Sequence, residues 1–186
     1  LMTSGEFDLS VGSVFGFAAV IMWTLFNTET LSLPLAFLVA LGLCLLIGFF
    51  SGIFVTKLAI PSFLVTLGML LVVRGTSLWL TDGFPQRAWN AGDQWIAEVL
   101  VGDFYICSTG IVQEACGGLR VHMSLIWFVL FALLCHYVLT RSRFGNWITA
   151  AGGNAAAARN RGVKVDRVRI ILFMFSSFMA GLAGII

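Results

Sequence analysis

The sequence of residues 30–56 reads TLSLPLAFLVALGLCLLIGFFSGIFVT, which is 27 consecutive residues without a charged side chain. A helix needs about 20 mainly apolar residues to cross the hydrocarbon core of a bilayer, so this stretch is long enough to span a membrane. A second stretch, 121–140, contains 20 residues without Asp, Glu, Lys or Arg. We therefore expect a membrane protein that crosses the bilayer more than once.

The composition of the whole chain leads to the same class. Of its 186 residues, 59% are hydrophobic and 11% are charged, whereas soluble domains carry about 25% charged residues. This excludes an ordinary soluble domain, a disordered chain, a disulfide-rich secreted fold and a nucleic-acid-binding protein. The chain has no signal-peptide pattern. It is expected to form one transmembrane domain, 1–186, that is an internal piece of a longer protein with further spans at both ends.

Five apolar stretches are predicted to be spans, and Pro34 and Pro61 stand at the start of two of them, where proline suits a first helical turn. The stretches are 11–27, 33–56, 61–80, 123–140 and 170–186. The alternating pattern of a membrane β-strand is absent from the sequence. The predicted fold class is therefore an all-α, polytopic transmembrane helical bundle with about five spans. Small residues at a spacing of four, such as Gly48 with Gly52, predict closely packed helices.

Charge sets the expected orientation of these spans. Segment 141–169 contains seven basic residues and one acidic residue, a net charge of +6. Segment 81–122 contains two basic and five acidic residues, a net charge of −3. Because basic residues concentrate in cytoplasmic loops, 141–169 is expected inside and 81–122 outside. Alternation of five spans then places Lys57 inside and Glu29 outside.

The external segment carries two local predictions. Residues 95–100 have apolar side chains at helical spacing, which suits either a short helix on the membrane surface or a packed loop. Cys107 and Cys116 lie in the same segment and either pair as a disulfide in an oxidising compartment or stay free. The cysteine and histidine spacing predicts no metal site.

Charged and polar residues near the spans suggest two further features. Arg74 lies well inside the third stretch, where it either faces a cavity or extends its side chain to the outer interface. Asp8 and Ser10 precede the first stretch and suit helix capping. If that segment enters the bilayer instead, Glu6 or Asp8 is placed to contact substrate or to pair with a cation.

The basic segment contains a predicted short helix. Asn154 is a good N-cap, the four alanines 155–158 favour helix strongly, and Gly162 suits the position after a helix end. Such a helix either docks in a groove of a soluble partner or lies on anionic lipid, held by its arginines. No nucleophile, acid–base or nucleotide-binding motif accompanies it, so the chain is not expected to be an enzyme.

Three stretches resemble the permease subunits of bacterial ATP-binding-cassette importers for simple sugars of the ribose/xylose type. Gly5–Ser13, GEFDLSVGS, is similar to the family's Gly-Gly-Ile-Asp-Leu-Ser-Val-Gly-Ser signature, with Glu6 where a glycine is usual. Residues 60–69, IPSFLVTLGM, followed by Arg74-Gly75, are similar to its Ile-Pro-Ser-Phe segment. Residues 140–163 are similar to its cytoplasmic loop. The three motifs occur in the family's order along nearly the whole chain.

The resemblance implies a function and a set of partners. The chain would be a permease subunit that translocates a monosaccharide across the bacterial inner membrane, paired with a second permease subunit as a homo- or heterodimer. Cytoplasmic ATPase subunits would bind ATP and Mg and supply the hydrolysis, so this chain itself would need no cofactor. A periplasmic binding protein would deliver the sugar, and membrane lipid would surround the spans.

The same resemblance suggests candidate site residues. The substrate pathway would be lined by weak polar contacts from Asp8, Ser10, Thr66 and Arg74. The ATPase-coupling helix would use residues of the basic segment, namely Asn154, Ala155, Ala157, Ala158, Arg159 and Gly162. Two alternatives stay open: a branched-chain amino acid permease of the same superfamily, and an ion-coupled secondary transporter with intramembrane carboxylates.

The charge asymmetry generates a prediction about topology. In a background without the native cysteines, Ser108→Cys should react with a membrane-impermeant thiol reagent in intact cells, whereas Asn160→Cys should react only after the cells are opened. Mass spectrometry of the purified protein measures both. Labelling of residue 160 but not residue 108 in intact cells would reverse the assignment.

Overall fold

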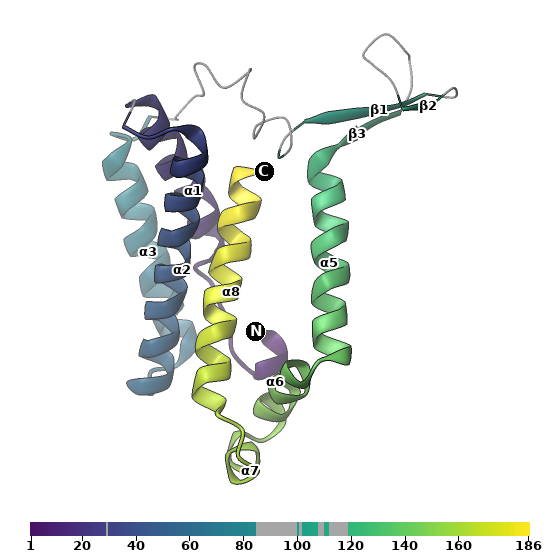
Figure 1. The fold of residues 1–186 in the computed structure, drawn as a ribbon. Coiled ribbons are helices and arrows are strands. Elements are labelled where there is room, and N and C mark those ends of the chain that lie inside the picture. The colour runs from purple at the N-terminus through teal and green to yellow at the C-terminus, as the bar shows by residue number, and fades with distance from the viewer. Residues whose placement is uncertain (29, 85–99, 101, 108–109, 112–118) are drawn as a thin grey trace.

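A computed structural model describes residues 1–28, 30–84, 100, 102–107, 110–111 and 119–186 (Figure 1). A single 3-10 turn, η1 (Met2–Ser4), opens the chain. The helices are α1 (Val11–Asn27), α2 (Leu33–Lys57), α3 (Ser62–Leu80), α5 (Met123–Arg141), α6 (Arg143–Gly153), α7 (Ala155–Asn160) and α8 (Val165–Ile185). The strands are β1 (Asp103–Cys107), β2 (Gly110–Ile111) and β3 (Leu119–His122).

The long apolar helices confirm the all-α polytopic class. In the described part of the chain, α2, α3, α5 and α8 are long and apolar enough to cross a membrane, and α1, at 17 residues, is shorter. The last span was predicted to begin at residue 170, but α8 begins at Val165. Arginine favours helix, so the basic residues 167 and 169 continue the helix beyond its apolar part.

The described strands of segment 81–122 and helices α6 and α7 of segment 141–169 lie at opposite ends of the bundle (Figure 1). Segment 81–122 contains a three-stranded antiparallel sheet of order β2-β1-β3, which the sequence analysis missed. Phe104 pairs with Val121, and β3 continues directly into α5. The predicted helix at 95–100 lies outside the described residues except for Leu100. Cys116 is also outside them, so the disulfide stays a prediction.

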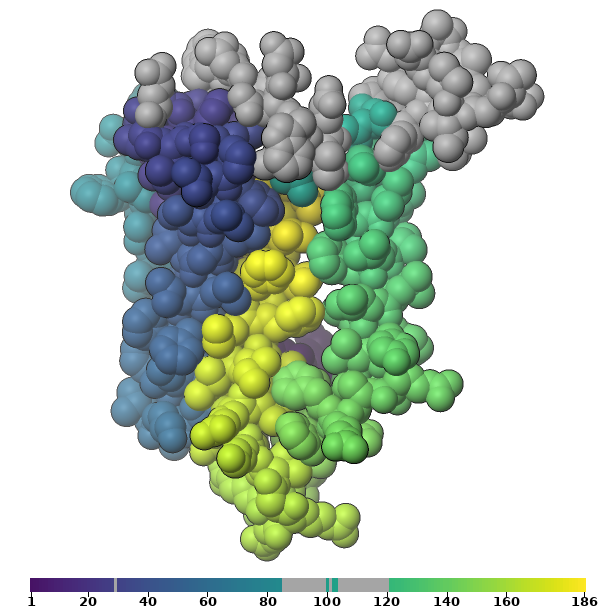
Figure 2. Space-filling model, in the orientation of Figure 1, coloured from purple at the N-terminus to yellow at the C-terminus, as the bar shows by residue number. Residues whose placement is uncertain are grey.

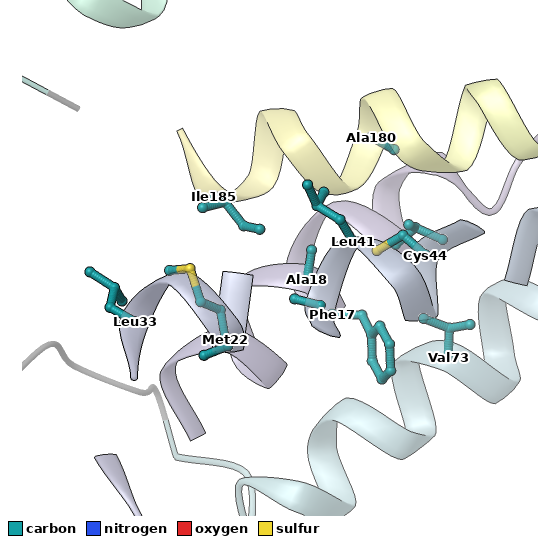
Figure 3. Packing of buried hydrophobic residues seen from close by; sticks show 12 residues of the cluster. Phe17, Ala18, Met22, Leu33, Leu41, Cys44, Val73, Ala180 and Ile185 are labelled. Atoms are coloured by element: carbon teal, nitrogen blue, oxygen red, sulfur yellow. The ribbon is translucent and has the colours of Figure 1, made fainter. Parts of the chain in front are cut away.

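The core of the bundle is formed where α8 packs against α1 and α2. Figure 3 shows Ala18 and Met22 of α1, Leu41 and Cys44 of α2 and Ala180 of α8 pointing into the same space. These side chains are all buried. About half of the larger apolar residues of α2 and α3 are exposed instead, as expected for helices that also face lipid.

Glycines determine how closely these helices approach. A Cβ atom at Gly48 would lie 2.5 Å from the backbone oxygen of Phe173, and one at Gly52 would lie 2.8 Å from the Cα atom of Ile170. At the other end of α8, a Cβ atom at Gly184 would lie 1.9 Å from the backbone oxygen of Phe15. The close packing predicted from Gly48 and Gly52 is therefore confirmed, with the backbones of α2 and α8 in contact.

Helix α5 stands apart from this core (Figure 2). None of the residues Met123–Arg141 that form it is buried. It contacts α6 and β3, while a cavity of about 460 Å³ separates its lower half from α8. Side chains of η1 and α6 complete the lining of this cavity. The tightly packed unit is thus α1, α2, α3 and α8.

The helix contacts generate a prediction about stability. Gly48→Ala should lower the thermal unfolding temperature in detergent, because an added methyl group overlaps the α8 backbone and overpacking costs about 1–3 kcal/mol. Gly42→Ala is the matched control, since it lies in the same helix and an added Cβ atom there would meet no atom within 4 Å. Equal unfolding temperatures for the two variants would contradict the predicted close contact.

Candidate functional site

The first ten residues run beside α8 (Figure 1), with three of them buried, namely Ser4, Glu6 and Ser10. Leu1 packs against the clusters that contain Phe173 and Ile148. The backbone of Thr3 lies so close to α6 that a Cβ atom at Gly152 would come within 2.0 Å of its carbonyl oxygen. Non-helical backbone at membrane depth is tolerated where protein buries it or where it borders a water-filled cavity. The position of this segment within the bilayer stays a prediction.

Polar contacts fix this segment to two helices. Glu6 Oε1 lies 3.1 Å from Arg169 Nε, and both side chains are largely buried, with 10% and 22% of their surface exposed. The Ser176 hydroxyl donates to Asp8 Oδ2 at 2.9 Å. The backbone N–H of Phe7 donates to Ser62 Oγ at 3.3 Å, which ties the segment to the start of α3. A buried carboxylate needs such partners, since an unpaired charge is costly away from water.

Capping of α1 differs from the expectation. Ser10 occupies the N-cap position, but its side chain makes no capping hydrogen bond. Its hydroxyl instead donates to Asp8 Oδ1 at 2.5 Å, and its backbone N–H donates to the same oxygen at 3.0 Å. Asp8 therefore stabilises the turn that leads into α1. Aspartate commonly accepts in this way from the backbone N–H two residues further along the chain. Ser10 is fully buried.

A groove between α1 and α3 is the candidate substrate site. It has a volume of about 450 Å³ and opens to the outside of the bundle. Its polar groups are Ser13, Arg74 and Ser77; the other lining residues are Gly12, Gly16, Phe17, Val20, Leu70 and Leu78. The hydroxyls of Ser13 and Ser77 donate to backbone carbonyls of their own helices, at 2.8 and 3.0 Å. Their oxygens are therefore left as acceptors beside the guanidinium donors of Arg74.

The structure separates the predicted pathway residues. Arg74 lies in the wall of the groove and is exposed. Asp8 and Ser10 lie just before α1, next to the groove but outside its lining. Thr66 is fully buried and its hydroxyl donates to the Ser62 carbonyl at 2.8 Å, so it is not accessible from the groove. A role of Thr66 in the pathway stays a prediction.

Sequence reasoning missed two groove hydroxyls. Ser13 ends the Gly5–Ser13 signature, and Ser77 follows Arg74 by three residues. Residues three apart lie on the same face of a helix, so a groove position for Ser77 could have been predicted from that of Arg74. No equivalent signal in the sequence indicates that α1 and α3 leave a groove between them.

The predicted cytoplasmic helix is present as α7. Asn154 caps it, accepting from the backbone N–H of Ala157 at 3.0 Å. Gly162 follows it with a φ of +84°, a left-handed conformation that glycine adopts without strain. Ala158 is buried against Ala151 and Val165, so it holds α7 in place and is not available for docking.

The outer face of α7 is the part left for a partner. Ala156 and Ala157 are exposed, as are the flanking residues Asn154 and Arg159, whereas Ala155 is half-buried. Arg159 also bridges to the next helix, because its Nη2 donates to Asp166 Oδ1 at 2.8 Å. The preceding helix, α6, was not predicted; the Ser142 hydroxyl caps it by accepting from the N–H of Gly145 at 3.0 Å.

These features define a polytopic α-helical membrane protein with a groove between α1 and α3 that contains three polar side chains, and with two capped short helices, α6 and α7, at one end. The chain belongs to the family described as branched-chain amino acid transport system / permease component, whose model matches residues 1–186. It is accordingly a multi-pass protein of the inner membrane.

Individual relatives have a more specific name. The chain is 35% identical over 188 residues to the Autoinducer 2 import system permease protein LsrC of Salmonella paratyphi B, covering 100% of this chain and 49% of that protein. Proteins of the same name from Photorhabdus luminescens and Escherichia coli O9:H4 are also 35% identical, with 51% and 49% of their length covered. The chain thus spans about half the length of the curated relatives it matches. No solved structure matches it.

Proposed function

We propose that residues 1–186 are part of the permease subunit of an ATP-binding-cassette importer that moves a monosaccharide or a similar small polyol across the inner membrane. The observation that carries this proposal is the 35% identity along the whole chain to permeases named for an import system. The groove between α1 and α3 supports it, since guanidinium donors and hydroxyl acceptors together suit a substrate rich in hydroxyl groups.

The groove favours a polyol over an amino acid. A zwitterionic amino acid presents a carboxylate and an ammonium group, and a binding site normally supplies a partner for each. Among the described residues, Arg74 suits the carboxylate, but no acidic side chain lines the groove for the ammonium group. The branched-chain amino acid interpretation of the family therefore ranks second.

An ion-coupled mechanism ranks lower again. It requires intramembrane carboxylates that are free to exchange an ion or a proton. The two acids of the N-terminal segment both have partners, since Glu6 pairs with Arg169 and Asp8 accepts from Ser10 and Ser176. This leaves ATP as the proposed energy source.

The proposal includes the partners. A second permease subunit, identical or different, would complete the translocation pathway, and a periplasmic binding protein would deliver the substrate. ATPase subunits on the cytoplasmic side would hold ATP and Mg and would contact the exposed face of α7. The short, capped α7 is suited to this, because a rigid helix fixed to α8 by the Arg159–Asp166 pair transmits force that a flexible loop would absorb.

Arg74 provides a test of the groove. Arg74→Ala in the full importer should reduce substrate uptake by about tenfold or more, because a hydrogen bond to a charged group contributes about 1.5–3 kcal/mol. Arg74→Lys should keep part of the uptake activity. In the unaltered importer, unlabelled monosaccharides should compete with the labelled sugar, whereas leucine should not. Uptake of radiolabelled sugar at equal expression measures this. Normal uptake by both variants would remove Arg74 from the pathway, and competition by leucine would favour the amino acid permease.

Ala157 provides a test of the docking surface. Ala157→Glu should leave the permease inserted but prevent the ATPase from co-purifying, because an unpaired charge in a close contact costs about 3–5 kcal/mol. The matched control is Ala150→Glu, an equally small and exposed site on α6. Loss of uptake with ATPase binding and substrate-stimulated hydrolysis intact would show that α7 is not the docking element.

A further inference from the structure

Two ion pairs lie on consecutive turns at the beginning of α8. Asp166 accepts from Arg159 of α7 at 2.8 Å, and Arg169, three residues later, lies 3.1 Å from Glu6 of the N-terminal segment. The first pair is partly exposed, with 55% and 39% of the side-chain surface accessible, while the second is largely buried. The start of α8 therefore joins α7 on one side and the N-terminal segment on the other.

The buried Glu6–Arg169 pair is an ion pair that lacks hydrogen-bond geometry. Arg169 Nε approaches Glu6 Oε1 without the alignment of a hydrogen bond, so the contact is mainly electrostatic. Such a contact holds two elements together while tolerating small changes of angle, because charge attraction depends less on direction than a hydrogen bond does. Asp8 is attached to the same helix two turns further along, through Ser176.

The two attachments, Glu6 to Arg169 and Asp8 to Ser176, occur in the same order along the N-terminal segment and along α8. Seven residues of helix from 169 to 176 advance by about 10 Å, and the two residues from Glu6 to Asp8 can advance by at most about 7 Å. The side chains of Glu6 and Asp8 bridge the difference. The segment is thus held to α8 at two points, and it leads directly into α1, whose first turns line the groove.

We propose that the Glu6–Arg169 pair is the positioning contact through which movement of the cytoplasmic helices reaches the segment before α1 and, through it, the groove. When α7 moves, the Arg159–Asp166 pair and the short connection from 161 to 164 move the start of α8. Arg169 then displaces Glu6, and the turn formed by Asp8 and Ser10 changes the position of α1 relative to α3. This inference rests on the proposed docking role of α7.

The test uses the complete importer in proteoliposomes, with ATPase subunits and binding protein. Glu6→Gln and Arg169→Gln should each reduce uptake per ATP hydrolysed by about tenfold or more while the ATPase still co-purifies and hydrolyses ATP. The reversed pair, Glu6→Arg with Arg169→Glu, should recover a substantial part of the uptake. Arg167→Gln, an exposed arginine two residues away on α8, is the matched control and should transport normally.

A second readout follows the segment itself. Leu9 is exposed and lies between Asp8 and Ser10, so the reactivity of Leu9→Cys in a cysteine-free background reports the position of the turn. This reactivity should differ between the nucleotide-free and vanadate-trapped importer. The difference should disappear when Glu6→Gln is added and return in the reversed pair.

Each outcome decides a specific point. Normal uptake and a normal reactivity difference in both single variants would overturn the inference while leaving the proposed function intact. If the glutamine variants fail to insert, the reversed pair Glu6→Arg with Arg169→Glu is the test. Restored membrane insertion without restored uptake would show that the contact stabilises the fold but does not transmit movement. Failure of the wild-type importer to couple ATP hydrolysis to uptake would instead contradict the proposed function.

Discussion

The contact of the α8 backbone with α1 and α2 is the interaction on which the rest of this structure depends. In a bilayer, lipid tails are as apolar as leucine, so helices associate mainly through close packing and not through the hydrophobic effect. Gly48 and Gly52 of α2 and Gly184 of α8 allow that packing by leaving no Cβ atom at the contact. Because α8 packs closely against both helices, the groups along its length can hold other elements against the bundle.

The N-terminal segment is held by such groups. A non-helical stretch inside a membrane protein exposes backbone polar groups that lipid cannot satisfy. Here Arg169 and Ser176 of α8 and Ser62 of α3 supply partners for Glu6, Asp8 and the N–H of Phe7. The same contacts place the start of α1 within the bundle. As a result, Ser13 in the first turn of α1 lines a groove together with Arg74 of α3.

The groove and the exposed face of α7 are separated along the bundle, and α8 contacts both α7 and α1, which forms one wall of the groove. A helix transmits displacement along its axis because its internal hydrogen bonds resist compression. Through the Arg159–Asp166 pair, α7 is joined to α8, and α8 is joined to the segment that shapes α1. These contacts support the proposed path between the exposed face of α7 and the groove.

The sequence by itself determined the class, the main long helices and α7, because length, hydropathy and capping act over a few neighbouring residues. Asn154, the alanines and Gly162 fixed α7 in this way, and Arg74 was singled out by its depth in an apolar stretch. Tertiary structure decided that Thr66 is buried, that Ser13 and Ser77 share the groove, and that Glu6 meets Arg169. The contact between Asp8 and Ser176 joins residues 168 positions apart. No local pattern specifies such a pair, because it forms only after α8 has packed against α1 and α2.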